Sequence, residues 1–150
     1  MNRTAVEDLH RACTERLLAI RGPRGEWRGQ LSPSALSTAV AAAALHRTGD
    51  DGCRQAAARG AAWLTRTILP DGGWGDTPLS RGNLSTSLLA FAALRDRRDS
   101  DSARAATRAE EWLCQRLGGL DAERLAAAVL AHYGDDRTFS VPILTLCALA

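Results

Sequence analysis

The sequence predicts an all-α fold in which helical hairpins repeat about every 48 residues and build part of an α/α toroid. Three observations predict it. Apolar residues recur at helical spacing, and no stretch alternates with the period of two that strands show. Helices that are apolar nearly all round alternate with helices that carry one charged face. Short motifs also recur along the chain at a spacing of 47 to 49 residues.

Seven helices are expected from their start and stop signals. The first begins at a T-x-x-E capping box on Thr4 and ends before Gly22. The second starts after Ser32 with Pro33 in its first turn and ends near Arg47, because serine caps helices and proline suits their first position. The remaining predicted helices cover 53–68, 84–95, 102–117 and 122–133, and a last one starts near Pro142.

The alternation of helix types predicts inner and outer layers. Helices 33–47 and 84–95 are almost wholly apolar and should be buried on all sides, whereas 53–68 and 102–117 have an arginine-rich face and should lie outside. Inner and outer helices in turn are what an α/α barrel requires. Phe91, on an inner helix, is the aromatic residue expected nearest the barrel lumen.

Three pairs of similar short segments support the repeat. "LSPSALST" (31–38) returns as "LSRGNLST" (79–86), "GEW" (25–27) returns as "GGW" (72–74), and "RGAAWL" (59–64) returns as "RAEEWL" (108–113). A single hairpin cannot bury its apolar face alone, so the hairpins should stack. Six hairpins of this length would need on the order of 290 residues to close a ring. We therefore expect the chain to be truncated at its C-terminal end, within "VPILTLCALA".

Composition excludes several classes of function. The net charge is +2, and all 19 cationic residues are arginines spread along the chain, which argues against a nucleic-acid partner, Schiff-base chemistry and a P-loop lysine. The four cysteines lack C-x-x-C spacing and should be reduced, buried thiols. Without a signal peptide or a membrane-spanning run, a cytoplasmic protein is expected.

No residue combination predicts catalysis or metal binding. Asp99 and Asp101 resemble an acid motif but stand where a helix cap is expected. The aspartate pairs 50–51 and 135–136 fall in turns, and His10, His46 and His132 have no metal-ligand spacing. We therefore predict no catalytic residue, no metal and no cofactor in this chain.

One motif resembles a known family. It comprises Arg59, Gly60, Trp63, Leu64, Gly72 and Trp74. Its spacing is similar to that of the QW motif of squalene–hopene cyclases and oxidosqualene cyclases, with Ile68 where that family has glutamine. Partial copies stand at residues 108–113 and 25–27. The glutamine partners the tryptophan and caps a helix in the family, so here the cap must come from elsewhere.

The resemblance implies that residues 1–150 are the amino-terminal part of a terpene-cyclase-like α/α-barrel domain. Such enzymes of terpenoid biosynthesis are isomerases that protonate an alkene or epoxide of a polyprenyl chain, without metal or organic cofactor. The family acid lies in a D-x-D-D motif of a carboxy-terminal barrel, and this sequence has none. The implied partners are a polyprenyl substrate and that missing barrel, with peripheral membrane association of the intact enzyme. The chain alone is predicted to be inactive and to form one wall of the cavity.

Two alternatives remain open. A toroid like the protein-prenyltransferase β-subunit would need Asp, Cys and His from different repeats to hold zinc, and no convincing set can be nominated. A non-catalytic helical-repeat interaction module explains the repeats equally well but not the QW-type spacing. The loop "ILPDGGWGDTPLS" (68–80) is predicted to be structural, with Trp74 tying hairpins together and Ser80 or Asn83 capping the next helix.

Overall fold

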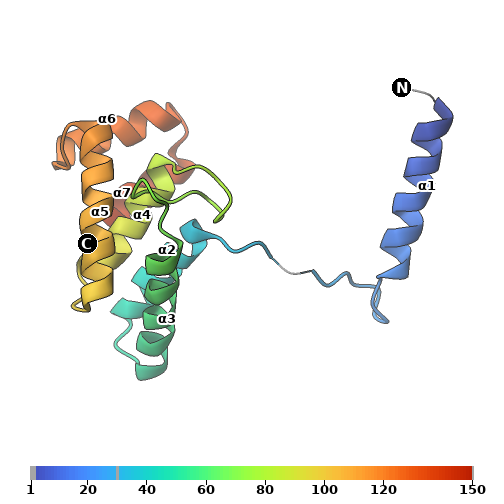
Figure 1. Cartoon of the computed structure of the whole chain (residues 1–150), viewed down its shortest axis with the longest axis horizontal. Coiled ribbons are helices and arrows are strands. Elements are labelled where there is room, and N and C mark those ends of the chain that lie inside the picture. Colours follow the sequence, from blue (N-terminus) through green and yellow to red (C-terminus); the bar gives the residue numbers. More distant parts are fainter. Residues whose placement is uncertain (1–2, 30, 150) are drawn as a thin grey trace. The chain divides into compact units, whose positions relative to one another are not determined.

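The computed structural model describes residues 3–29 and 31–149, and its regular structure there is helical. The helices, shown in Figure 1, are α1 (Arg3–Ala19), α2 (Ala35–Arg47), α3 (Asp51–Thr67), α4 (Leu84–Arg95), α5 (Ser100–Leu117), α6 (Ala122–Tyr133) and α7 (Arg137–Leu149). The described residues contain no sheet, only an isolated antiparallel bridge between Arg21 and Trp27. The all-α prediction is therefore confirmed.

The chain divides into two compact units. Unit 1 covers Met1–Ser32 and contains α1 with the turn that follows it. Unit 2 covers Pro33–Ala150 and contains α2 to α7. The buried hydrophobic cluster lies wholly in unit 2, whereas α1 has no buried residue.

Asx residues begin four of the helices. The side chains of Asp50, Asn83, Asp99 and Asp121 each accept a hydrogen bond from the backbone N–H three residues later. This bond satisfies one of the N–H groups that a helix start leaves unpaired. The same donors, the N–H groups of Cys53 and Ser102, lower the pKa of Asp50 and Asp99. Asp99 is therefore a cap.

Several helices start at other residues than the sequence predicted. α2 begins at Ala35 behind the N-cap Ser34 rather than at Pro33. The backbone N–H of Ala35 donates to the carbonyl of Asp76 at 3.1 Å, so a contact from a distant loop fixes where α2 starts. α7 begins at Arg137, and Pro142 lies inside it rather than in its first turn. In addition, Thr4 lies within α1 rather than at its cap.

Helix α4 is the centre of unit 2. Nine of its 12 residues are buried, and it packs against α2, α5 and α7. Each charged helix packs on the apolar helix that precedes it in sequence, α3 on α2 and α5 on α4. α2 is buried only along the side that carries Ala35, Ala39, Ala42 and Ala43. Other residues of α2, including Val40, are exposed, so the prediction of burial on all sides was wrong for α2.

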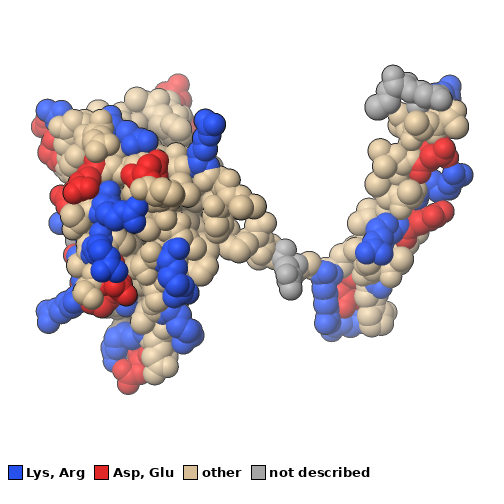
Figure 2. Space-filling model, in the orientation of Figure 1, with Lys and Arg blue, Asp and Glu red and all other residues tan. Residues whose placement is uncertain are grey.

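The surface of unit 2 is mixed in charge. On the face that Figure 2 shows, arginines and acidic residues lie interspersed with uncharged surface. Within residues 3–29 and 31–149, each helix is too short or too polar to span a bilayer.

Candidate functional site

The loop between α3 and α4 is organised around Trp74. This side chain is only 1% exposed, and its indole Nε1–H donates to the carbonyl of Leu64 at 3.0 Å. Its backbone N–H donates to Ser87 Oγ at 2.9 Å, and its carbonyl accepts from the Asn83 N–H at 2.9 Å. Ile68 is partly buried and packs against the core cluster that includes Trp74. The indole therefore caps the last turn of α3 where the family glutamine is missing, and it joins α3 to the start of α4.

Residues from α5 hold the same loop from the other side. Trp112 Nε1–H donates to Asp71 Oδ2 at 2.9 Å, and the Arg116 guanidinium lies 3.5 Å from the centre of the Trp112 ring. The hydrogen bond from Trp112 is the main cause that lowers the pKa of Asp71. Arg108 donates to the carbonyls of Leu69 and Pro70 at 2.9 and 3.0 Å. The partial motif copy on α5 thus binds the loop of the preceding hairpin.

Asp76 links the loop to the starts of α2 and α4. Its Oδ1 accepts from Thr86 Oγ1 at 2.7 Å and from Asn83 Nδ2 at 2.8 Å, and these two donors lower the pKa of the carboxyl group. Its carbonyl accepts from the N–H of Ala35 at the start of α2. Because two protein donors bind its Oδ1 and its carbonyl accepts from α2, Asp76 is a structural group in this loop.

The predicted motif residues occupy distinct places. Gly60 faces α2, where an added Cβ would lie 3.2 Å from the Cβ of Ala42, so the missing side chain permits close packing. Gly72 has a φ of +98°, which favours glycine. Leu64 is fully buried and Trp63 half-buried against the core, whereas the Arg59 side chain is exposed. The loop, the α2–α3 contact and packing on the core account for every motif position except Arg59.

An apolar groove is the second candidate feature. It has a volume of about 360 Å³ and lies between α2, α4 and α7. It is lined by Leu36, Val40, Leu89, Phe139, Val141, Pro142, Ile143, Thr145, Leu146 and Leu149. None of these described lining residues carries a charge. A groove of this kind can hold hydrocarbon but cannot donate a proton.

Phe139, not Phe91, is the aromatic residue in this groove. Phe91 lines a different cavity, of about 470 Å³, together with Arg95, Glu110 and Cys147. The Arg95 guanidinium lies 5.7 Å from the Phe91 ring centre. Burial raises the pKa of the Cys147 thiol. Because α4 is apolar all round, its sequence pattern could not show which side Phe91 faces.

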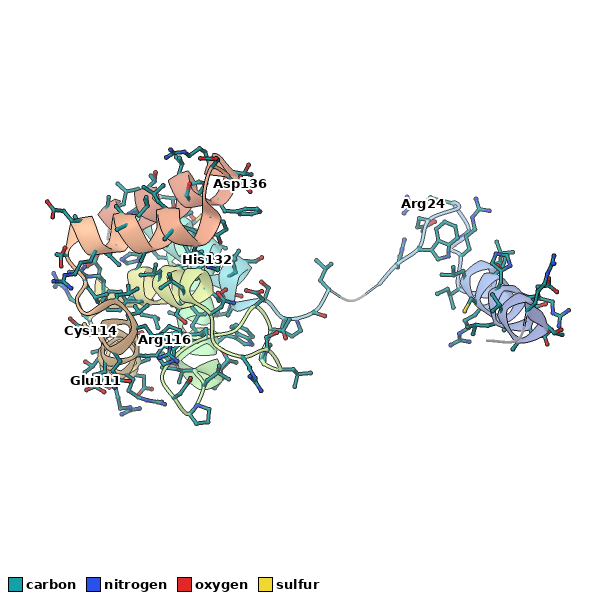
Figure 3. The ribbon with its side chains drawn as sticks, turned by 90° about the horizontal axis from the view of Figure 1, so that it is seen from above. Arg24, Glu111, Cys114, Arg116, His132 and Asp136 are labelled. Carbon is teal, nitrogen blue, oxygen red and sulfur yellow. The ribbon has the colours of Figure 1, made fainter. Side chains whose placement is uncertain are left out.

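The titratable residues that the structure describes do not assemble into a metal site. Figure 3 shows Glu111, Cys114 and Arg116 on α5, and His132 and Asp136 at the end of α6 and in the turn after it. In the described part of the chain, no group of three or more His, Cys, Asp or Glu side chains is placed to hold a metal ion.

Comparison with known proteins agrees with the motif. The model of the squalene-hopene cyclase N-terminal domain matches residues 10–145. The chain belongs to this family. No curated protein and no solved structure matches the chain. The resemblance that the QW-type spacing predicted is therefore confirmed, over a range that reaches from α1 into α7.

Proposed function

We propose that residues 1–150 form the amino-terminal barrel segment of a squalene-cyclase-like terpene cyclase and supply one wall of its hydrocarbon cavity. The groove between α2, α4 and α7 carries this proposal, because its lining is apolar and uncharged. A polyprenyl chain offers no polar group for recognition, so its binding depends on burying apolar surface. The alternation of α2 and α4 with the outer α3 and α5 fits a partial α/α toroid.

Five aspartates of this segment are poorly suited to supply the proton for cyclisation. A general acid must hold a proton at the working pH. The aspartates Asp50, Asp71, Asp76, Asp99 and Asp136 all have a lowered pKa, because hydrogen-bond donors stabilise their ionised forms. At neutral pH they therefore carry no proton to donate. In this proposal a carboxy-terminal barrel supplies the acid, and the intact enzyme associates peripherally with the membrane.

Hydrocarbon binding and turnover test the proposal together. The purified chain is incubated with squalene and shorter polyprenes, and products are sought by gas chromatography with mass spectrometry. Binding of a polyene fluorophore, and its displacement by squalene, is followed in parallel. We expect displaceable binding and no product. Product formation by this chain would refute the claim that it lacks the acid.

A matched pair of variants locates the binding. Val40→Asp places a charge in the groove at an already exposed position, and its expected effect is a loss of at least about tenfold in affinity for the fluorophore, or about 1.4 kcal/mol. Leu79→Asp places the same charge on a side chain that is 98% exposed and outside the groove. It should leave the affinity unchanged. Equal losses in both variants would contradict binding in the groove.

A further inference from the structure

A small pocket between the end of α3 and the start of α5 is rich in arginine. It has a volume of about 150 Å³ and is separate from the apolar groove, with which it shares no lining residue. Its charged lining consists of Arg66 from α3 and of Asp101, Arg104 and Arg108 from α5. These four side chains give the pocket a net charge of +2.

Arg108 is already held in place by the protein. Its Nη2 donates to the carbonyls of Leu69 and Pro70 at 2.9 and 3.0 Å, and the residue is half-buried. Because a carbonyl group has no formal charge, these bonds orient the guanidinium without neutralising it. A group that is fixed in advance loses little conformational freedom when a ligand binds. Arg108 therefore supplies a positioned positive charge.

The other two arginines differ in their partners. Arg104 forms an ion pair with Asp101 at 2.7 Å, and both side chains are largely exposed. Among the residues that the structure describes, none forms a hydrogen bond or an ion pair with the guanidinium of Arg66, in the last turn of α3. The last turn of α3 and the first turn of α5 are opposite ends of helix dipoles, so their effects offset each other. The arginine side chains therefore set the sign of the field in the pocket.

We propose that this arginine pocket binds a small tetrahedral oxyanion, namely phosphate or a phosphomonoester group. A guanidinium can donate two parallel N–H bonds to the oxygens of such an anion. The oxygens of a phosphate do not lie in one plane, so they can meet guanidinium groups that come from two different helices. A carboxylate has only two oxygens and cannot satisfy three arginines in this way.

The size of the pocket limits the ligand to one such group. A volume of about 150 Å³ corresponds to roughly five water molecules at the density of the liquid. That space suits a single phosphate group with some of its hydration water. Inorganic phosphate and the phosphomonoester head of a lipid share this chemistry. The proposal is independent of hydrocarbon binding in the groove and is tested separately from it.

Titration of the purified chain with inorganic phosphate at low ionic strength, followed by isothermal calorimetry, tests the site. Arg66→Gln removes a positive charge without breaking a side-chain bond within the described structure, and it should weaken phosphate binding by about fivefold to tenfold. Arg59→Gln is the matched control, because Arg59 is also an exposed arginine of α3 but lies outside the pocket. It makes the same change in net charge and should alter the affinity by less than about twofold.

A third variant should act in the opposite direction. Asp101→Asn removes the carboxylate that competes with the anion for Arg104, so phosphate should bind about twofold to threefold more tightly. Weaker binding in Asp101→Asn would contradict the proposal. The absence of phosphate binding at millimolar concentration, or equal affinities of Arg66→Gln and Arg59→Gln, would overturn it.

Vesicles identify the source of the phosphate group. The chain is sedimented with vesicles of phosphatidylcholine alone and with vesicles that also contain phosphatidic acid. Retention on phosphatidic acid that Arg66→Gln abolishes and Arg59→Gln preserves would support the site and assign it to a lipid head group. Binding of inorganic phosphate without retention on either vesicle would support the site and assign it to a free anion.

Discussion

The turns around Trp27 and Trp74 share their hydrogen bonds and differ in their surroundings. Each indole N–H donates to the backbone carbonyl ten residues earlier, in the last turn of the preceding helix. Each turn also contains a glycine with positive φ. Of the two, only Trp74 is buried. Its backbone N–H binds Ser87 near the start of α4, and the ring of Trp112 from α5 lies against the neighbouring Gly73. The local sequence is thus sufficient to form the turn, whereas burial of the tryptophan depends on the neighbouring repeat.

The largest expected effect comes from Trp74→Ala. Removing this buried indole leaves a cavity and an uncapped carbonyl on Leu64, so unit 2 should lose about 3–5 kcal/mol of stability. Urea unfolding followed by circular dichroism measures the loss. A change below about 1 kcal/mol would show that the loop does not depend on its tryptophan.

Gly73→Ala should have the next largest effect. An added Cβ would lie 2.6 Å from Cε2 of Trp112, so the ring has to move away from the loop. We expect a loss of about 1–3 kcal/mol, measured by the same urea titration. Gly29→Ala is the matched control, because its added Cβ meets nothing within 4 Å, and it should be nearly neutral.

The pair of Trp112 and Asp71 predicts a pH dependence. The pKa of Asp71 is lowered in the folded state below its ordinary value of 3.8, first through the hydrogen bond from Trp112. The stabilisation is therefore fully present above the unfolded pKa and is lost as the pH falls through the lower folded pKa. As the pH falls below about 4, the urea midpoint of unfolding should decrease less in Asp71→Asn than in the unsubstituted chain. Trp112→Phe, which removes the donor, should weaken the same pH dependence, and an unchanged profile would contradict this assignment.

Trp27→Ala should have the smallest effect. The side chain is half exposed and lies in unit 1, so the free energy of unfolding of unit 2 should change by less than about 0.5 kcal/mol. The comparison with Trp74→Ala uses the same chemical change in the same turn geometry. A loss as large as that of Trp74→Ala would mean that Trp27 is buried in solution.

Local signals predicted most of the fold. The predicted bounds of α4 and α6, residues 84–95 and 122–133, agree with the structure, and Asp99 caps α5 as expected. Caps are visible in sequence because a short side chain bonds an N–H only three residues away. The QW-type spacing also indicated the family, since glycine and tryptophan positions in the loop follow from its backbone geometry.

The remaining features depend on contacts between distant residues. The start of α2 is set by the bond from Ala35 to Asp76, which lies in the next loop. The Tyr133 hydroxyl at the end of α6 lies 2.7 Å from Ser85 Oγ on α4, 48 residues away in the chain. The groove contains Phe139 from the C-terminal helix, which only packing of α7 on α4 brings there. A helical period shows which side chains share a face, but not which neighbour that face meets.

The position of Asp76 also bears on how unit 2 opens. One residue holds the first turn of α2 through its carbonyl and the first turn of α4 through its carboxylate. Transient release of this loop therefore frees the beginnings of two helices at once. Amides in these two turns should exchange with solvent as one cooperative group, although 48 residues separate Ser37 from Ser85 in the chain.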